Sequence, residues 1–411
     1  MNLLVTALFA LAQNFPPDDA IAVNPQDWPW WRGPNFNAVV SDQKLVTQWS
    51  EAKNVVWKAP VPGRGHSSPI IVGSRVFLAT ADEKAKAQSV LCFDRETGKE
   101  LWRTKVHEGA VEGRYHGKNT LASSTLACDG KLVFAVFHHE SSIWATALDL
   151  DGKQVWQEKV GKFVSHWGYS ASPTLYRSTI IIATDHKQGG ALFALERATG
   201  KLRWETPRPP APSYASPIVL NVAKKDQLLI AGANQIISYD PDTGKQLWSA
   251  KGTSLECVST IIADGDRIFA TGGFPDKETL CIRADGSGEV VWRVKAGDFV
   301  PSQILHKGHI YCVLDNGVAF CLNADTGKET WKDRLGGAFS ASPILVGENI
   351  YIPSESGKTF VFQANPNKLE LVADNQLGKG IYASPAVSRG RLYLRVVSAD
   401  KGQEMLYCIG Q

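Results

Sequence analysis

The strongest constraint on the fold is a short segment that returns along almost the whole chain. Each copy has an apolar run, a polar turn that contains Gly, and a second run that ends in Trp. The clearest copies are residues 94–102, 240–248 and 323–331, and the more divergent ones are 149–156, 196–204 and 283–292. This pattern predicts a β-hairpin, because the turn Gly can adopt the positive φ that a tight reversal of the chain requires.

The Trp that ends each segment defines the period of the repeat. It is Trp57, Trp102, Trp156, Trp204, Trp248, Trp292 and Trp331, with Leu371 at the next expected place. Successive Trp residues are 39 to 54 positions apart, and a period of roughly 40–50 residues is typical of one four-stranded propeller blade. We expect these Trp residues to be structural anchors, since a large indole ring is readily buried once its N–H has a partner.

A second marker alternates with the first: Ser followed by Pro, or a related pair, at the start of an apolar strand. Its eight copies begin at Ser68, Ser124, Ser172, Ser216, Ser259, Ser302, Ser342 and Ser384. Pro as the first residue of a strand removes no hydrogen bond from the sheet. Two markers with the same count predict an all-β fold, an eight-bladed β-propeller of four-stranded antiparallel blades.

The two ends of the chain predict how the ring closes. After the last marker come only two strand-like runs, 391–395 and 405–409, so the last blade lacks its outer strand. Residues 55–58 form a strand that contains Trp57 and has no blade before it. We expect this N-terminal strand to complete the last blade, because closure removes the open edge that a sheet must otherwise protect.

The chain divides into four segments along its 411 residues. Residues 1–12 are apolar and end in Ala-Leu-Ala, which is typical of a signal peptide; a mis-assigned start codon or a disordered tail is the alternative. Residues 13–26 are predicted to be a linker, 27–53 a Trp-rich strap across the propeller, and 54–411 the propeller itself. A binding face is the alternative for the strap Trp residues. We expect a periplasmic or secreted protein without a membrane span, since the apolar run at 1–12 is too short to cross a bilayer.

Charge and cysteine content narrow the function classes. Lys and Arg number 44 against 41 Asp and Glu, a net charge of +3, which gives no reason to expect nucleic-acid binding. The seven Cys are odd in number, none are adjacent, and no C-x-x-C occurs. Four of them share one repeat position, two before the turn, where other blades have Ala, Ser or Val. We therefore expect buried, unreactive thiols in a slot for a small side chain.

These motifs resemble those of a known family. The small residue, the Asp two positions later, Thr-Gly-Lys and Trp are similar to the tryptophan-docking repeat of the PQQ-like (quinoprotein-type) propellers, over about residues 54–411. The repeat also resembles the propeller subunit of the outer-membrane β-barrel assembly machine. The segments 31–35 (Trp-Arg-Gly-Pro-Asn) and 63–69 look like the exported PQQ-like proteins of planctomycetes. The resemblance implies an eight-bladed propeller and leaves open whether a quinone is bound.

The quinoprotein enzymes of this family have an adjacent Cys-Cys ring near the cofactor, a calcium held by Glu and Asn, and an Asp base. No two Cys are adjacent here, and no c-type haem motif occurs. Asp298, Glu256 and Asn119 lie near the predicted inner-strand starts but outside any matching motif. We expect no catalytic residue, no metal site and no cofactor; PQQ with calcium is the alternative.

The phase of the repeat predicts a candidate funnel on one face. The connections that lead into the inner strands and those between the second and third strands of each blade share that face. The candidate ligand-binding residues there are Arg64, His66, Arg114, His116, Asn119, His166, Trp167, Tyr169, Asp185, His186, Tyr214 and Tyr382, with Lys118, His138, His139, Glu140 and Phe339 beside them. Such residues suit a small-molecule or peptide pocket, or a metal; polar connections on a solvated face are the structural alternative.

The sequence therefore predicts an exported propeller that acts as a non-catalytic scaffold. Its loop faces would bind a protein, peptide or envelope polymer, and not nucleic acid. The oligomeric state is open, with a monomer as the expectation. A quinoprotein dehydrogenase or metal-dependent enzyme with its site at the funnel is the alternative function.

Overall fold

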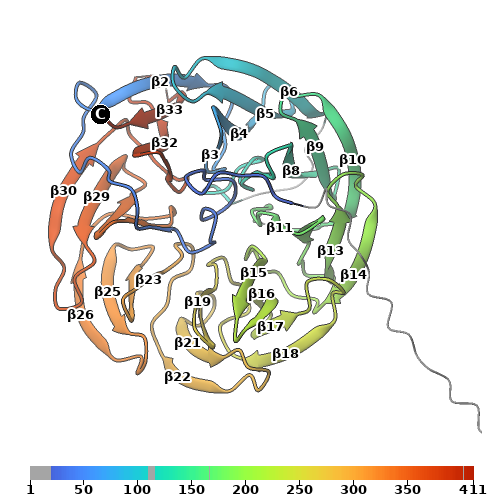
Figure 1. Ribbon diagram of the computed structural model, residues 1–411, viewed down its shortest axis with the longest axis vertical. Helices are drawn as coiled ribbons and strands as arrows, with labels where there is room; N and C mark the ends of the chain where they lie inside the picture. Colours follow the sequence, from blue (N-terminus) through green and yellow to red (C-terminus); the bar gives the residue numbers. More distant parts are fainter. Residues whose placement is uncertain (1–19, 110–115, 166, 401) are drawn as a thin grey trace, which may run out of the picture.

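Eight β-sheets stand in a ring around a central axis (Figure 1), which confirms the predicted eight-bladed propeller. The computed structural model describes residues 20–109, 116–165, 167–400 and 402–411. The expected signal peptide at 1–12 lies outside these residues, as do the candidate funnel residues Arg114 and His166. Within the described residues there is no helix long and apolar enough to cross a membrane.

Blades 1 to 4 follow one another along the chain, each from the axis outwards. Blade 1 contains β3 (Ile70–Val72), β4 (Arg75–Asp82), β5 (Ala87–Asp94) and β6 (Glu100–Glu108). Blade 2 contains β7 (Ala127–Cys128), β8 (Leu132–His139), β9 (Ser142–Asp149) and β10 (Gln154–Lys162). Blade 3 contains β11 (Thr174–Tyr176), β12 (Thr179–Ala183), β13 (Gly190–Glu196) and β14 (Leu202–Arg208). Blade 4 contains β15 (Ile218–Val222), β16 (Lys225–Gly232), β17 (Gln235–Tyr239) and β18 (Gln246–Lys251).

Blades 5 to 8 complete the ring. Blade 5 contains β19 (Ile262–Asp264), β20 (Arg267–Gly272), β21 (Glu278–Arg283) and β22 (Val290–Val294). Blade 6 contains β23 (Ile304–His306), β24 (His309–Val313), β25 (Val318–Asn323) and β26 (Glu329–Arg334). Blade 7 contains β27 (Ile344–Val346), β28 (Asn349–Pro353), β29 (Lys358–Gln363) and β30 (Leu371–Gln376), and blade 8 contains β31 (Ala386–Ser388), β32 (Arg391–Val397), β33 (Glu404–Ile409) and β2 (Val55–Val61).

The burial of each strand reflects its place in the blade. The middle strands, such as β4, are packed on both faces by neighbouring blades and are almost wholly buried and apolar. The outer strands alternate between exposed and partly buried residues. In β6 every second residue faces solvent as far as Lys105, and Val106 and His107 are then both buried. The hydrophobic core therefore lies between the blades, and no blade buries its faces alone.

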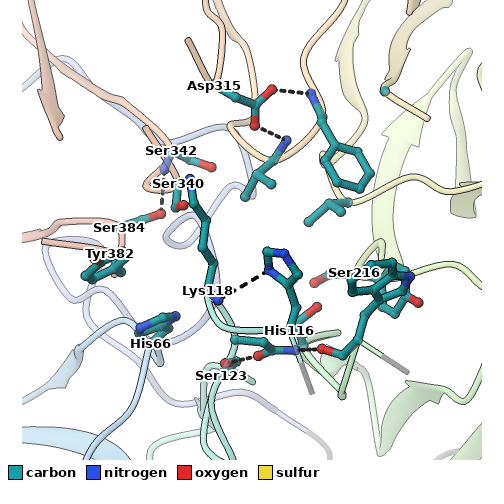
Figure 2. Close-up of a pocket in the computed structure, with 18 of the residues that line it drawn as sticks. His66, His116, Lys118, Ser123, Ser216, Asp315, Ser340, Ser342, Tyr382 and Ser384 are labelled. Carbon is teal, nitrogen blue, oxygen red and sulfur yellow. Dashed lines mark hydrogen bonds between the residues drawn. The ribbon is translucent and has the colours of Figure 1, made fainter. Parts of the chain in front are cut away.

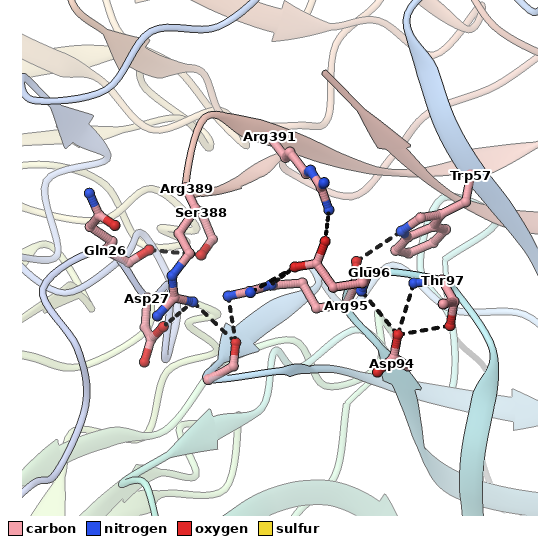
Figure 3. A network of polar contacts seen from close by, with 11 residues as sticks. Gln26, Asp27, Trp57, Asp94, Arg95, Glu96, Thr97, Ser388, Arg389 and Arg391 are labelled. Atoms are coloured by element: carbon pink, nitrogen blue, oxygen red, sulfur yellow. Dashed lines mark hydrogen bonds and ion pairs between the residues drawn. The ribbon is translucent and has the colours of Figure 1, made fainter. Parts of the chain in front are cut away.

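The ring closes where β2 pairs antiparallel with β33, with Trp57 opposite Cys408. Further contacts join blade 8 to blade 1 at this junction (Figure 3): the Trp57 indole donates to the Arg95 carbonyl at 2.9 Å, and Arg391 pairs with Glu96 at 2.6 Å. The first propeller strand thus supplies the outer strand that the last blade lacks, as the sequence predicts.

The Trp of each outer strand joins its blade to the next one. The indole Nε1 donates to a backbone carbonyl in the next blade's turn: Trp102 to Leu150 at 2.9 Å, Trp156 to Arg197 at 2.7 Å, Trp204 to Pro241 at 3.2 Å, Trp292 to Ala324 at 2.9 Å and Trp331 to Asn365 at 2.8 Å. Trp248 donates instead to Gln227 of its own blade at 2.7 Å, and Gln227 donates to the Ala284 carbonyl of the next blade at 2.7 Å. Every one of these Trp residues therefore contacts its neighbour directly or through one side chain.

The small-residue slot that holds four of the Cys lies opposite these Trp residues. Cys92 is the cross-strand partner of Trp102, and Cys321 is that of Trp331. All seven Cys are buried and unpaired. A small side chain is required at this position because the neighbouring indole ring occupies the space on the same face of the sheet.

Blade 7 departs from the repeat. Residue Ala373, not Leu371, is the partner of the slot residue Val361, and Leu371 is 52% exposed. The missing ring comes from the strap: Trp49 is buried and stacks on Tyr351 of β28 with 6.3 Å between ring centroids. In blade 8 the outer-strand Trp57 contacts the equivalent Tyr393 at 6.0 Å. The expectation that Leu371 takes the Trp place is wrong, because a sequence period cannot reveal an indole supplied from another segment.

The strap at 27–53 crosses the ring near its centre (Figure 1), and it contacts the turn between the first and second strands of blade 8. Trp28 exchanges backbone hydrogen bonds with Ile71 of blade 1, at 2.8 and 2.9 Å. Its strand β1 (Val39–Val40) then adds a parallel fifth strand to the inner edge of blade 7, and Gln43 accepts from Gly390 of blade 8 at 2.8 Å. Before the strap, Ala22 donates to Asp129 of blade 2 at 2.8 Å.

Substitution of the turn glycine tests the joint between blades. Gly98 has φ +71°, and an added Cβ would lie 2.5 Å from the Trp57 ring; Gly73 has φ +58° with no atom within 4 Å. Both Ala variants carry the cost of a positive φ, and only Gly98→Ala adds the clash, about 1–3 kcal/mol more destabilisation. Chemical denaturation should show this difference; equal loss in the two variants would contradict the packing argument.

Candidate functional site

A cavity of about 590 Å³ opens at the centre of the ring (Figure 2) and is lined by residues of all eight blades. We call it the funnel. Most of its lining belongs to the connections that lead into the inner strands. In blades 5 and 6 the connections between the second and third strands also contribute, through Phe274, Lys277 and Asp315. A cavity of this size is within the usual range for small-molecule and peptide sites.

Hydroxyl groups at the starts of the inner strands form a circle at the bottom of the funnel, and hydrogen bonds join six of its eight steps. The backbone N–H of one blade donates to the hydroxyl of the next: Ser68 to Thr125 at 3.1 Å, Thr125 to Ser172 at 3.0 Å, Ser172 to Ser216 at 2.9 Å, Thr260 to Ser302 at 3.0 Å, Ser302 to Ser342 at 2.9 Å and Ser342 to Ser384 at 2.8 Å. The residues of the second sequence marker therefore supply the hydroxyls of this circle. Thr125 and Thr260, rather than Ser124 and Ser259, take the position in blades 2 and 5.

The strap forms the floor. Trp31 lines the funnel, and its indole Nε1 donates to the Thr260 hydroxyl at 2.8 Å. The neighbouring Arg32 is 3% exposed and donates to the Gln303 carbonyl at 2.6 Å, which fixes the strap under blade 6. Burial lowers the pKa of Arg32 to about 9. The strap thus covers the end of the central channel opposite the loops that form the funnel wall.

Aromatic rings form the wall. His66 stacks on Tyr382 with 4.7 Å between centroids and 9° between planes (Figure 2). His116 packs edge-on against Trp167 with 5.0 Å between ring centroids. The Asn119 side-chain amide donates to the Trp167 carbonyl at 2.6 Å. Burial, followed by the charges of Arg395 and Arg64, lowers the pKa of His66 to about 3, so this imidazole is neutral at physiological pH.

Among the residues that the structure describes, four charged side chains line the funnel. Lys118 pairs with Glu355 at 2.8 Å. The two oxygens of Asp315 each accept a backbone N–H, from Phe299 and Val300, at 3.1 Å (Figure 2). Lys277 is exposed at the rim, and Glu256 is 8% exposed in the wall.

The structure brings half of the candidate residues together. Those that line the funnel are His66, His116, Asn119, Trp167, Tyr214 and Tyr382, with Lys118 and Phe339. Four others lie elsewhere: exposed Arg64 contacts the Gly117 carbonyl at 3.3 Å, Tyr169 is buried against the Ala183 carbonyl at 3.0 Å, Asp185 pairs with buried Arg208 at 2.8 Å, and His186 packs on Phe163 at 6.0 Å. Blade order predicts the face that a residue lies on, but not the direction of its side chain.

Sequence reasoning missed several lining residues. Trp31 could not be placed because its partner Thr260 is 229 positions away. Phe274, Lys277, Phe299 and Asp315 come from blades 5 and 6, where we assigned no candidate. A signal existed for these residues, since they occupy the same connections that supplied the candidates of blades 1 to 4.

The histidines among the candidate residues do not gather at one place. His66 and His116 face the funnel, whereas His139 lies between blades 1 and 2 and stacks on His107 with 4.5 Å between centroids. His138 packs on Phe163 at 5.0 Å. Among the residues that the structure describes, no group of three His, Cys, Asp or Glu is arranged to ligate a metal.

The buried His107 predicts a loss of stability in acid. Burial, followed by the charge of His139, lowers its pKa from 6.5 to about 4. The unfolded chain then takes up a proton at higher pH than the folded chain, so stability falls as the pH drops from about 6.5 to 4. His107→Gln should remove about 3 kcal/mol of that fall, at about 1.4 kcal/mol per pKa unit. Denaturation curves at pH 7.5 and 4 measure this; an unchanged pH dependence would contradict it.

Eight four-stranded blades, inter-blade indoles and a central funnel define a PQQ-like β-propeller. A sequence profile described as "Outer membrane protein assembly factor BamB" matches residues 35–162, 84–271, 215–300 and 276–368. The chain belongs to this family of PQQ-like propellers.

Individual relatives and structures carry different names. The chain is 23% identical over 381 residues to outer membrane protein assembly factor BamB of Yersinia pestis. The alignment covers 86% of this chain and 89% of the Yersinia protein. It is 24% identical over 332 residues to tetrathionate hydrolase of Acidithiobacillus ferrooxidans, covering 72% of this chain but 64% of the hydrolase. A europium-containing methanol dehydrogenase has the same fold, with a TM-score of 0.71, 12% identity and coverage of 94% and 98%. The likeness to this structure shows the fold alone.

Proposed function

We propose that this protein is an exported, non-catalytic scaffold that binds a protein or peptide segment of the cell envelope through the funnel face. The observation that carries the proposal is the mouth of the funnel, where two large apolar side chains that line the cavity stay in solvent: Trp167 is 42% exposed and Phe274 is 54% exposed. Exposed aromatic residues around an apolar depression are typical of protein-binding surfaces, where such residues contribute most of the binding energy.

The family supports this class of function. Relatives across most of the chain's length are named for the assembly of outer membrane proteins. We carry over only the class of partner, a protein of the envelope. The expected signal peptide at 1–12 agrees with a periplasmic or secreted location, and the rigid ring favours binding without a large change of shape.

Photo-crosslinking tests the proposal. A crosslinking residue at position 277, on the exposed rim of the funnel, should capture a partner segment in the native envelope, and mapping of the crosslink identifies that segment. Trp167→Ala with Phe274→Ala should lower capture at least tenfold. The matched control, Leu202→Ala with Leu371→Ala, removes side chains of 56% and 52% exposure from the outer strands and should leave capture unchanged. Equal capture by both double variants would overturn the proposal.

We also propose that the funnel works without PQQ and calcium. The donors of the funnel do not fit that pair: Asp315 already accepts two backbone N–H groups, and the Asn119 side-chain oxygen accepts from Thr120 at 2.7 Å. Glu256 lies on blade 5 and Asn119 on blade 2, so the two belong to different parts of the wall. All seven Cys are buried and none are adjacent in the sequence.

The alternative, a quinoprotein dehydrogenase or metal-dependent enzyme, makes an opposite prediction for the purified protein. We expect a colourless protein with far less than one calcium or transition-metal ion per chain. Absorption spectroscopy and elemental analysis of protein from its native envelope measure both quantities. Quinone absorption or stoichiometric calcium would favour the enzyme.

A further inference from the structure

Glu256 is a buried carboxylate in the funnel wall without a side-chain partner among the described residues. It follows β18 in the connection to blade 5, where its own N–H donates to the Phe274 carbonyl at 3.0 Å. Its side chain lines the funnel and is 8% exposed, and none of the ion pairs or side-chain hydrogen bonds within the described part of the chain reaches it. Burial raises the pKa of Glu256, and the charge of Lys187 offsets this only in part, so the carboxylate has lost hydration that no hydrogen bond of the described residues replaces.

The other charged side chains among the described lining residues either have partners or remain in solvent. Lys118 is paired with Glu355, which also accepts from the Ser340 hydroxyl at 2.7 Å, and Asp315 accepts two N–H groups. Lys277 is exposed at the rim, where its ammonium group remains hydrated. The cost of desolvation therefore falls on Glu256, and a ligand that neutralises it gains more than one that neutralises Lys277.

The surroundings of Glu256 are aromatic. Tyr214, Phe274 and Trp31 line the same cavity as Glu256, and Phe274 is joined to Glu256 by a backbone hydrogen bond. Burial raises the pKa of Tyr214, and the charge of Glu256 adds to this; the Tyr214 backbone N–H donates to the carbonyl of Cys257, the residue after Glu256, at 2.8 Å. Aromatic faces attract organic cations, most strongly where water is excluded.

We infer that the funnel binds an organic cation, an alkylammonium or guanidinium group on an apolar stem, which pairs with Glu256 between the aromatic rings of Tyr214, Phe274 and Trp31. The inference rests on the proposed function, since the same face would receive a Lys or Arg side chain of the partner segment. A free amine has the same chemistry and is the other source. The apolar stem would fill the cavity above the hydroxyl circle.

Three probes with one apolar stem test the charge preference of the unaltered full-length chain: 4-phenylbutylammonium, 4-phenylbutanol and 4-phenylbutyrate, titrated with ligand-observed NMR at pH 7.5. We expect the ammonium to bind at least tenfold more tightly than the alcohol and the carboxylate most weakly. Equal binding of ammonium and alcohol, or tightest binding of the carboxylate, would overturn the inference. This comparison needs no variant, so it does not depend on how a substitution folds.

Variants then locate the charge. Glu256→Gln keeps the size of the side chain and should remove the preference for ammonium over alcohol. Asp315→Asn and Lys277→Gln are the matched controls in the same funnel and should keep it. A preference that survives in Glu256→Gln, or that is lost in Asp315→Asn instead, would overturn the assignment to Glu256.

Crosslinking of Glu256→Gln through position 277 separates the two sources of the cation. Reduced capture of the partner segment assigns the cation to a Lys or Arg side chain of that segment. Unchanged capture with lost ammonium binding assigns it to a free amine. If the Trp167 and Phe274 double variant captures partner normally while the probes still bind selectively, the proposed function fails and the cation site stands.

Discussion

The fold depends on one contact repeated around the ring, the indole of an outer strand against the turn of the next blade. Each indole brings a large apolar surface and one N–H, and the turn offers a carbonyl and a Gly with no side chain in the way. Because the contact always runs from one blade to the next, blades are stabilised only in sequence order. The chain therefore needs a closed ring, and the β2–β33 pairing supplies it.

The exceptions separate the two parts of this contact. In blade 4 Trp248 keeps its place, and its hydrogen bond reaches the next blade by a relay through Gln227 to the Ala284 carbonyl. In blade 7 the outer strand has no Trp, and Trp49 of the strap stacks on Tyr351 while its indole Nε1 has no hydrogen-bond partner among the described residues. The space is therefore filled in both blades, because an unfilled space of that size would cost several kcal/mol.

The strap has a second consequence, which concerns function. A propeller has an open channel along its axis, and here Trp31 covers one end of it while Arg32 fixes the strap to the Gln303 carbonyl. The channel becomes a funnel. Its floor and wall are aromatic and hydroxyls line its bottom, so among the described lining residues Glu256 is the buried charge without a side-chain partner. A rigid site of this kind is suited to hold the end of a ligand or side chain.

The sequence by itself determined the number of blades, the position of each repeat Trp and the pairing of the two chain ends. These features follow from a repeated pattern that can be recognised within short segments of the chain. It also placed His66, His116, Asn119, Trp167, Tyr214 and Tyr382 on the face where they line the funnel. Only the tertiary structure decided that Asp185 pairs with the buried Arg208, that Trp49 stacks on Tyr351 in blade 7, and that the Trp31 indole donates to the Thr260 hydroxyl. The physical reason is distance along the chain: a repeat fixes neighbours one blade apart, whereas the strap finds its partners by packing into spaces that form only when the ring has closed.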